Sequence, residues 1–312
     1  MEARYILVNG TFRCGTNPNR FTKNLTITLT GSGNGNFFGY GDKYLVVEGG
    51  GTLSLHGKAR TPWVRLTQTA PQGATTLHLE DHDWKVGDRL VIASTDFRPE
   101  QAEEVTIVAK NGNRVTIDQP LEYMHYCGTE TYRNRDITEC AEVGLLKRNI
   151  TIRGNANSDN TLLGGHAMFR SGSTIKVEGA EFQRMGQVGR LGRYPVHWHM
   201  QRDNGHGQYV RSCAIRNTFN RAITIHGSHG VAAEDNVCYD AEGHAVFFED
   251  GVEQDNRLVG NLVLATRKPA AGEEMLPHDN SLDEPQNRSP AAFWISHPSN
   301  VIDGNVAADS FG

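Results

Sequence analysis

The second half of the chain repeats a short pattern, in which a few strand-forming residues are followed by a tight turn. The turn carries Asn or a small residue at positions 155, 180, 213, 236, 261 and 305. The intervals are 25, 33, 23, 25 and 44 residues, and the last is close to two repeats. A β-rich repeat of this period is typical of a parallel β-helix, in which each repeat forms one coil and buries its inward side chains against neighbouring coils. The longer intervals predict insertions at about 186–195 and 267–290.

The first part of the chain also consists of short strand-like runs separated by turns. Leu25–Leu29 alternates with a period of two, and Asn111-Gly112 between two such runs indicates a hairpin turn. The chain has 34 glycines and lacks runs of Ala, Leu, Glu and Lys at helical spacing, which excludes a helical bundle. We therefore predict an all-β protein, with a Gly-rich all-β domain over residues 1–125 and a right-handed parallel β-helix over residues 126–312. Both ends stop within a strand-like pattern, so we expect a fragment of a longer chain.

The net charge of the chain limits the binding partners that it can have. A formal net charge of -5 argues against nucleic acid, because phosphate binding requires clustered Lys and Arg. No apolar stretch approaches the roughly 18 residues that a membrane span needs, so no span is expected in this fragment. We expect a monomer.

Five cysteines leave one unpaired if the others form disulfides. Cys127 and Cys140 bracket a short polar segment and could pair in an oxidising compartment. The alternative is that all five are free thiols. Cys213 and Cys238 lie in strand-like runs and are expected to be core thiols.

Three strands that follow successive turns share one pattern: Val196–His199, Ile223–His226 and Val246–Glu249. In each, the first and third residues are apolar and should face into the coil, so the second and fourth should face outward. His199, His226 and Glu249 then form one file along the outer face, with His197 beside it.

Clustered imidazoles on one face have three interpretations. His197, His199 and His226 are candidate ligands of a divalent metal, either zinc or calcium. The same side chains suit hydrogen bonding to a sugar chain. The third interpretation is a solvated surface with ordinary histidines.

Acid–base candidates lie close to these histidines in sequence. Glycoside hydrolysis typically needs two carboxylates, whereas a lyase needs a base and a group that neutralises the substrate carboxylate. Glu249, Asp250 and His244 are the candidate catalytic residues. If Glu249 binds a metal it cannot easily donate a proton as well, so these two roles are alternatives.

Side chains that could contact an acidic sugar flank the same strands. Arg193 and Arg221 are the candidate partners of substrate carboxylates. Tyr194 and Asp203 complete the expected substrate-binding set.

Several blocks resemble the family of the cell-migration-inducing hyaluronan-binding protein and the transmembrane cell-surface hyaluronidase. They are Gly192–His199, Thr224–Gly230, Gly243–Gly251 and Ala141–Ile150, while Lys85–Thr95 looks like part of the eight-glycine domain that precedes the β-helix in that family. The resemblance implies an extracellular or secreted protein that acts on hyaluronan or a related acidic polysaccharide.

Two departures bear on the substrate. Trp198 and Met200 stand where animal members of the family have Phe and Leu, and the loop at 267–290 is shorter. A microbial relative acting on another acidic polysaccharide is therefore an alternative. We expect binding and depolymerisation of a glycosaminoglycan by hydrolysis on the outer face of the β-helix. A lyase on that face, or a non-catalytic carbohydrate-binding or adhesion module, is the alternative.

Overall fold

The computed structural model describes residues 1–274 and 290–310. Strands and turns dominate this part of the chain, which forms two units. One unit contains Met1–Ala59 and Arg148–Gly312, and the other contains Arg60–Lys147. No helix among the described residues has the length and apolar character needed to cross a membrane.

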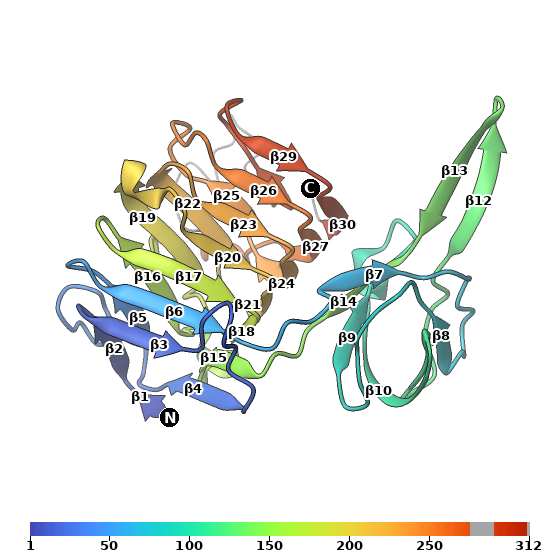
Figure 1. The fold of residues 1–312 in the computed structure, drawn as a ribbon, viewed down its shortest axis with the longest axis horizontal. Coiled ribbons are helices and arrows are strands. Elements are labelled where there is room, and N and C mark those ends of the chain that lie inside the picture. The colour runs from blue at the N-terminus through green and yellow to red at the C-terminus, as the bar shows by residue number, and fades with distance from the viewer. Residues whose placement is uncertain (275–289, 311–312) are drawn as a thin grey trace. The chain divides into compact units, whose positions relative to one another are not determined.

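The first unit is a parallel β-helix with three sheets, and its strands can be followed from blue to red in Figure 1. Sheet A contains β1 (Glu2–Ala3), β4 (Leu25–Leu29), β15 (Ile150–Gly154), β18 (Ala180–Gln183), β21 (Ala214–Thr218), β24 (Val237–Glu242), β27 (Leu262–Arg267) and β30 (Val306–Ser310). Sheet B contains β2 (Tyr5–Val8), β5 (Tyr44–Val47), β16 (His166–Arg170), β19 (Val196–Arg202), β22 (Ile223–Ser228), β25 (Val246–Phe248) and β28 (Phe293–Trp294). Sheet C contains β3 (Thr11–Cys14), β6 (Thr52–His56), β17 (Thr174–Glu178), β20 (Tyr209–Arg211), β23 (Ala232–Glu234), β26 (Arg257–Val259) and β29 (Val301–Asp303). The predicted parallel β-helix and all-β class are thus confirmed.

The interior of the coils is formed by alternate side chains of the strands. Val196, Trp198, Ile225 and Phe248 are all fully buried in one core cluster, as their positions along the strands predict. Successive coils therefore bury one another's apolar faces, which is the physical reason why the repeat is needed for stability.

Asparagines stack at the turns between coils. Asn236 donates from Nδ2 to Oδ1 of Asn261 at 3.0 Å, and Asn261 donates in the same way to Asn305 at 2.9 Å. Each side chain satisfies buried polar groups of the adjacent coil, which explains why Asn recurs at this turn.

The boundary between the units differs from the predicted one at residue 125. Residues 1–59 supply the first two coils of the β-helix rather than a separate domain, and Leu25 of β4 pairs with Ile150 of β15. Residues 126–147 belong to the inserted unit instead of the β-helix. Alternating strand patterns do not reveal their pairing partners, and here the partners lie on opposite sides of an 88-residue insertion (147 − 60 + 1).

The inserted unit contains a six-stranded antiparallel sheet in the order β7-β14-β9-β10-β11-β8. Its strands are β7 (Trp63–Arg65), β8 (Thr76–His78), β9 (Arg89–Ile92), β10 (Glu103–Asn111), β11 (Arg114–Ile117) and β14 (Glu142–Leu145). A short 3-10 helix, η1 (Pro99–Gln101), precedes β10. The predicted hairpin turn is confirmed, since Asn111 pairs with Arg114 across Gly112.

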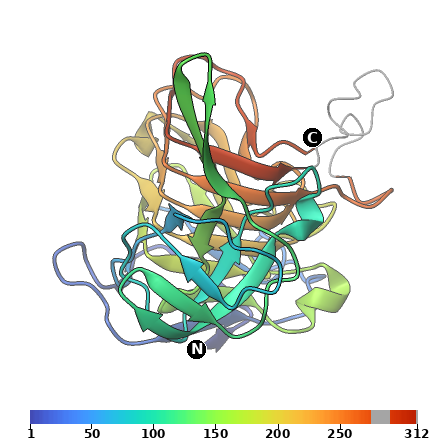
Figure 2. The ribbon, with the colours of Figure 1, turned by 90° about the vertical axis from the view of Figure 1, so that its right-hand side faces the viewer.

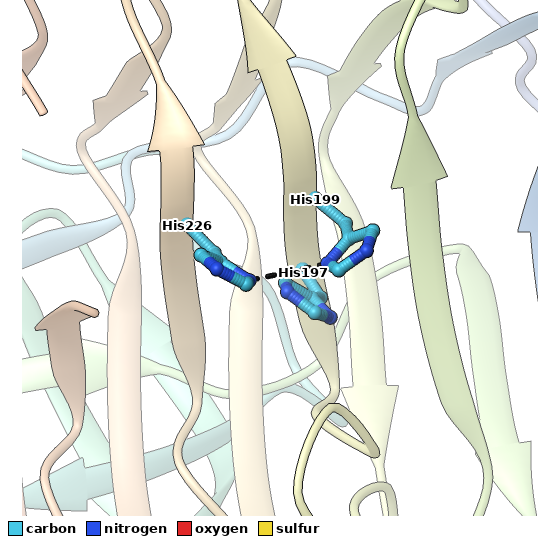
Figure 3. A group of neighbouring side chains, drawn as sticks. All are labelled: His197, His199 and His226. Atoms are coloured by element: carbon cyan, nitrogen blue, oxygen red, sulfur yellow. Dashed lines mark hydrogen bonds between the residues drawn. The ribbon is translucent and has the colours of Figure 1, made fainter. Parts of the chain in front are cut away.

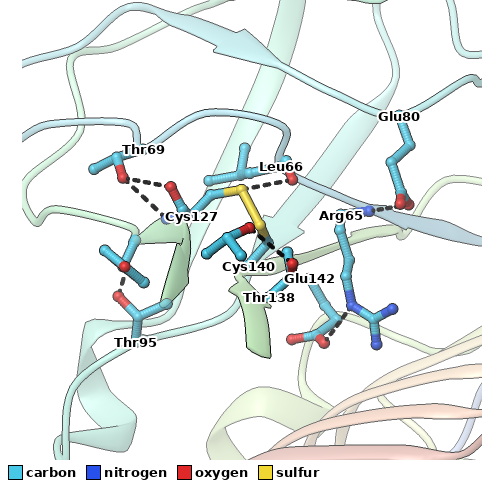
Figure 4. The surroundings of a disulfide bond; sticks show 11 residues. Arg65, Leu66, Thr69, Glu80, Thr95, Cys127, Thr138, Cys140 and Glu142 are labelled. Carbon is cyan, nitrogen blue, oxygen red and sulfur yellow. Dashed lines mark hydrogen bonds and ion pairs between the residues drawn. A yellow bond between two sulfur atoms is a disulfide. The ribbon is translucent and has the colours of Figure 1, made fainter. Parts of the chain in front are cut away.

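A narrow two-stranded ribbon, β12 (Cys127–Tyr132) and β13 (Arg135–Cys140), also belongs to the inserted unit (Figure 2). Cys127 lies opposite Cys140, and the two form a disulfide at the base of the ribbon (Figure 4). Of the two alternatives for the cysteines, pairing is the one found. Cys213 and Cys238 are buried free thiols, as expected.

The two predicted insertions lie between strands of sheets A and B. Residues 186–195 connect β18 to β19, and α1 (Ser158–Thr161) lies in the corresponding connection one coil earlier. Most of the predicted insertion at 267–290 lies outside the described residues.

Candidate functional site

The register of sheet B matches the expected file of outward side chains. His199 of β19 pairs with His226 of β22, and Ile225 pairs with Phe248 of β25. Glu249 directly follows Phe248, which places it beside His226 on the next coil. The file continues in the other direction to Arg170 of β16, which pairs with His199.

Three imidazoles meet on this face (Figure 3). One nitrogen from each of His197, His199 and His226 lies within 4.8 Å of the others. The Nδ1 atoms of His199 and His226 are 3.1 Å apart. His197 uses Nδ1 to contact the carbonyl oxygen of Gly192 at 3.2 Å, and its buried Nε2 has no hydrogen-bond partner among the described residues.

The insertion at 186–195 packs against His197. His197 is buried under it, with the ring of Tyr194 edge-on at 4.8 Å. Burial, and then the neighbouring His199 and His226, lower the pKa of His197 well below its ordinary value. Burial and His226 likewise lower the pKa of His199 to about 4. Both rings are therefore neutral near pH 7, which is the form that binds metals.

Two carboxyl groups approach His226 from different sides. Asp250 places Oδ2 3.1 Å from Nε2 of His226, whereas Glu249 places Oε2 3.9 Å from Nδ1. The other oxygen of Glu249 lies 3.5 Å from the hydroxyl of Tyr194. Burial raises the pKa of Glu249, so its environment favours the protonated carboxyl more than water does.

Glu253 belongs to the run of carboxylates that includes Glu249 and Asp250, and it supports the backbone next to two of the site residues. It is fully buried, and Oε1 accepts hydrogen bonds from the backbone N–H groups of Gly227 at 2.9 Å and Asp250 at 3.0 Å. These two residues directly follow His226 and Glu249. The clustering of carboxylates between Glu242 and Glu253 was the available sequence signal.

Two arginines lie near the imidazoles. Arg193 is half-buried, and burial followed by the charge of Arg190 lowers its pKa. Arg221 is buried with its guanidinium carbon 3.6 Å from the ring centroid of Phe247. The charge of Arg221 acts on both Glu249 and His244.

The structure does not bring every predicted residue to the imidazoles. Asp203 is exposed in η2 (Asp203–Gly205), beyond the end of β19. His244 precedes β25, whereas Glu249 follows it, so their backbones are separated by about 16 Å along the strand. His244 instead accepts a hydrogen bond from the N–H of Ala291 at 2.9 Å and stacks on Phe247. Burial and then Arg221 lower the pKa of His244 to about 3.

The donor atoms decide which ion the cluster suits. Two nitrogens bound to one tetrahedral zinc at 2.0–2.1 Å lie about 3.4 Å apart, close to the 3.1 Å between His199 and His226. Three imidazoles suit zinc, copper, iron or nickel, whereas calcium prefers oxygen ligands. His197, His199 and His226 therefore fit a transition metal better than calcium.

The strands and the site define a parallel β-helix that is interrupted by a second all-β unit and carries a histidine cluster on one outer face. Residues 1–67 match the family model of the G8 domain, and residues 162–312 match that of the CEMIP beta-helix. The chain belongs to these two families over those residues. The G8 match is shorter than the predicted domain of residues 1–125, and it contains the first two coils.

Curated relatives extend the comparison. Fibrocystin-L of Mus musculus is 36% identical over an alignment that covers 99% of this chain and 8% of that protein. Protein rliB of Dictyostelium discoideum is 33% identical, and the alignment covers 99% of this chain and 28% of that protein. The chain thus spans less than a third of the length of either relative.

Among solved structures, tailspikes of bacteriophages are similar to this chain. Tailspike gp61 of Pseudomonas phage phi297 has a TM-score of 0.26 and 12% identity, covering 85% of this chain and 43% of that one. Tailspike gp54 of Acinetobacter baumannii bacteriophage AP22, solved in complex with a capsular saccharide, has a TM-score of 0.26 and 12% identity, covering 86% and 53%.

Proposed function

We propose that the outer face of sheet B binds an acidic polysaccharide of the glycosaminoglycan type outside the cell and cleaves it by hydrolysis. The observation that carries this proposal is the convergence on one face of three imidazoles, a largely buried carboxyl group and a half-buried arginine. The imidazoles of His197 and His199 are neutral near pH 7. The resemblance to hyaluronan-degrading proteins favours hyaluronan as the first substrate to test. The disulfide supports an extracellular location, because disulfides persist in oxidising compartments.

Arg193 is the proposed contact for a substrate carboxylate. Within residues 1–274 and 290–310, the charged neighbour that acts on Arg193 is another cation, Arg190, and this half-buried positive charge suits an anionic ligand. An arginine binds carboxylates through two parallel hydrogen bonds, which provides orientation as well as affinity.

A divalent transition metal is the proposed cofactor, held by His197, His199 and His226. When bound, such an ion polarises an oxygen of the substrate or lowers the pKa of a bound water. Calcium is the less suitable ion, since the three donors are nitrogens.

The two carboxyl groups have different proposed roles. Glu249 is largely buried beside the cluster and is the candidate proton donor to the leaving sugar oxygen. Asp250 lies 3.1 Å from the remote nitrogen of His226 and is the group proposed to orient that ring. In this proposal Glu249 donates a proton and does not bind the metal, so it has one of the two alternative roles.

A digestion assay tests the function. Purified protein is incubated with hyaluronan, chondroitin and pectin, with a chelator and after adding zinc back, and chain length is measured. We expect shortening of at least one polymer without an ultraviolet-absorbing unsaturated product. An unsaturated product would show a lyase, and binding without shortening under any metal condition would show a binding module.

Histidine variants test the site itself. The double variant H199A/H226A should lose both bound metal and polymer shortening, whereas H78A in the inserted unit should retain both. Unchanged metal content in the folded double variant would contradict the metal assignment.

A further inference from the structure

A second group of rings lies on the same face of sheet B as the imidazoles. Tyr5 stacks on Phe37 and on Tyr44, with centroid distances of 5.2 Å in both cases. Phe38 meets Tyr5 edge-on at 5.8 Å. Tyr44 in turn contacts the ring of His166 at 5.8 Å. Tyr44 and His166 are fully buried, whereas Tyr5 and Phe37 are partly exposed and Phe38 is exposed. The buried rings therefore pack against the partly exposed ones on the side of the coils that carries the histidine cluster.

The register gives the distance between the two groups. Tyr5 of β2 pairs with Tyr44 of β5, which pairs with His166 of β16, and β16 is the neighbour of β19. At about 4.8 Å per coil, Tyr44 lies about 10 Å and Tyr5 about 14 Å from the coil of His197. A polysaccharide several sugar units long that lies along the coils is long enough to reach from the imidazoles to the exposed ring of this group, Phe38.

Phe38 combines exposure with an unusual backbone. Its side chain is 70% exposed, and its φ is +52°. The left-handed region costs a residue other than glycine about 1–2 kcal/mol, and the exposed ring gains little of the burial that would offset this cost. Exposure and strain at one aromatic residue point to a ligand that covers the ring.

The loop that carries Phe38 is joined to the insertion beside the imidazoles. Arg190 donates to Oδ1 of Asn34 at 2.8 Å, and Gln187 donates to the carbonyl oxygen of Asp42 at 3.0 Å. Arg193 packs over Gly41, where a Cβ atom would lie 3.2 Å from its Nε. The loop that carries Phe38 therefore contacts the insertion that carries Arg193, and this insertion in turn contacts His197 through Gly192.

We propose that Phe38 and Arg193 form a further sugar-binding subsite, which holds a unit of the acidic polysaccharide away from the one at the imidazoles. The apolar C–H face of a sugar ring stacks on Phe38, and the carboxylate of the chain contacts Arg193. The proposal rests on the proposed function, because it takes the same polymer as its ligand. The subsite contributes only to chains long enough to reach from the imidazoles to Phe38.

Chain-length dependence tests the subsite. Dissociation constants are measured for hyaluronan oligosaccharides of increasing length on the wild type, on F38A and on F38W. We expect F38A to weaken binding of long oligosaccharides about tenfold, with no change for the shortest one that binds. F38W should retain wild-type affinity at every length, because it keeps a flat ring.

The inserted unit provides a matched control. Phe97 is also a fully exposed phenylalanine, so F97A should leave every dissociation constant unchanged. If the wild type binds oligosaccharides and F38A equals it at all lengths, or weakens all lengths equally, the subsite is refuted while the proposed function stands. If the wild type binds none of the hyaluronan or chondroitin oligosaccharides, both proposals are refuted.

Discussion

The Nδ1 atoms of His199 and His226 face each other at 3.1 Å across two neighbouring coils of the β-helix. One of the two must donate and the other accept if they share a hydrogen bond, whereas both present lone pairs if they share a metal. Asp250 lies 3.1 Å from the remote nitrogen of His226, and a proton held there leaves Nδ1 as a lone pair. The contact between Asp250 and His226 therefore favours the metal-binding tautomer.

Removal of Asp250 should weaken metal binding without removing a ligand. For D250A we expect a loss of about 10–100-fold in zinc affinity, as is typical when a carboxylate behind a ligating histidine is removed. Zinc affinity can be measured by competition with a chelating dye. D203A is the control, since Asp203 is exposed beyond the end of β19. Equal zinc affinity for D250A and the wild type would show that Asp250 does not orient His226.

Replacement of Glu253 should lower the free energy of unfolding, although Glu253 is not one of the three histidines of the cluster. E253A leaves the N–H groups of Gly227 and Asp250 without their buried acceptor, and should lower the free energy of unfolding by about 3 kcal/mol. E253Q keeps an oxygen at this position and should cost less. Denaturant unfolding measures both variants. Equal stability of E253A and the wild type would mean that other groups satisfy the two amides.

The stabilising contribution of Glu178 to the β-helix should be lost in acid. Burial raises the pKa of Glu178, but hydrogen bonds from Arg20 and Arg211 lower it by more, so the net pKa lies below the ordinary value of 4.5. A lowered carboxyl pKa stabilises the folded state above pH 4.5, and this contribution is lost as the pH falls through the folded pKa. The stability difference between the wild type and E178Q should thus be largest near pH 7 and shrink below about pH 4.5.

Unfolding by denaturant at several pH values measures this difference. E234Q is the control on the same sheet, because Arg257, the partner of Glu234, is half exposed and the pair is screened by water. A stability difference for E178Q that stays constant down to pH 3 would contradict the prediction.

Reduction of the disulfide should open the ribbon of β12 and β13. The bond closes a short loop with a sequence separation of 13, and a constraint of this length contributes about 3 kcal/mol to the stability of the ribbon. A two-stranded ribbon with no further partner is marginal by itself. Trypsin should therefore cleave after Arg133 or Arg135 faster in the reduced protein, as mass spectrometry of a digestion time course would show. Equal cleavage rates before and after reduction would contradict this prediction.

The periodic features of the sequence predicted the β-helix and the orientation of its side chains. Because alternate residues of a strand face opposite sides, the local pattern of Val196–His199 and Ile223–His226 was enough to place Trp198 inside and the histidines outside. The stacking of Asn236 on Asn261 follows from the same repeat.

The local sequence pattern did not predict which distant strands pair with one another. The sequence pattern predicts a separate domain that contains strands β1 to β6, whereas in the structure Leu25 of β4 pairs with Ile150 across the inserted unit. An alternating strand fits any sheet with one covered face, so its sequence does not identify its neighbour.

In the candidate site, too, some features follow from the local sequence and others from the tertiary structure. Sequence alone determined that His197, His199 and His226 share a face, because the coil repeat and the two-residue strand period are both local. Only the tertiary structure decided which other groups join them. The fold places Asp250 next to His226, and it places Glu253 where it accepts hydrogen bonds from the N–H groups of Gly227 and Asp250. Asp203 and His244, in contrast, lie away from the imidazoles. Turns and insertions place these residues, and their course depends on packing between coils rather than on any repeat in the sequence.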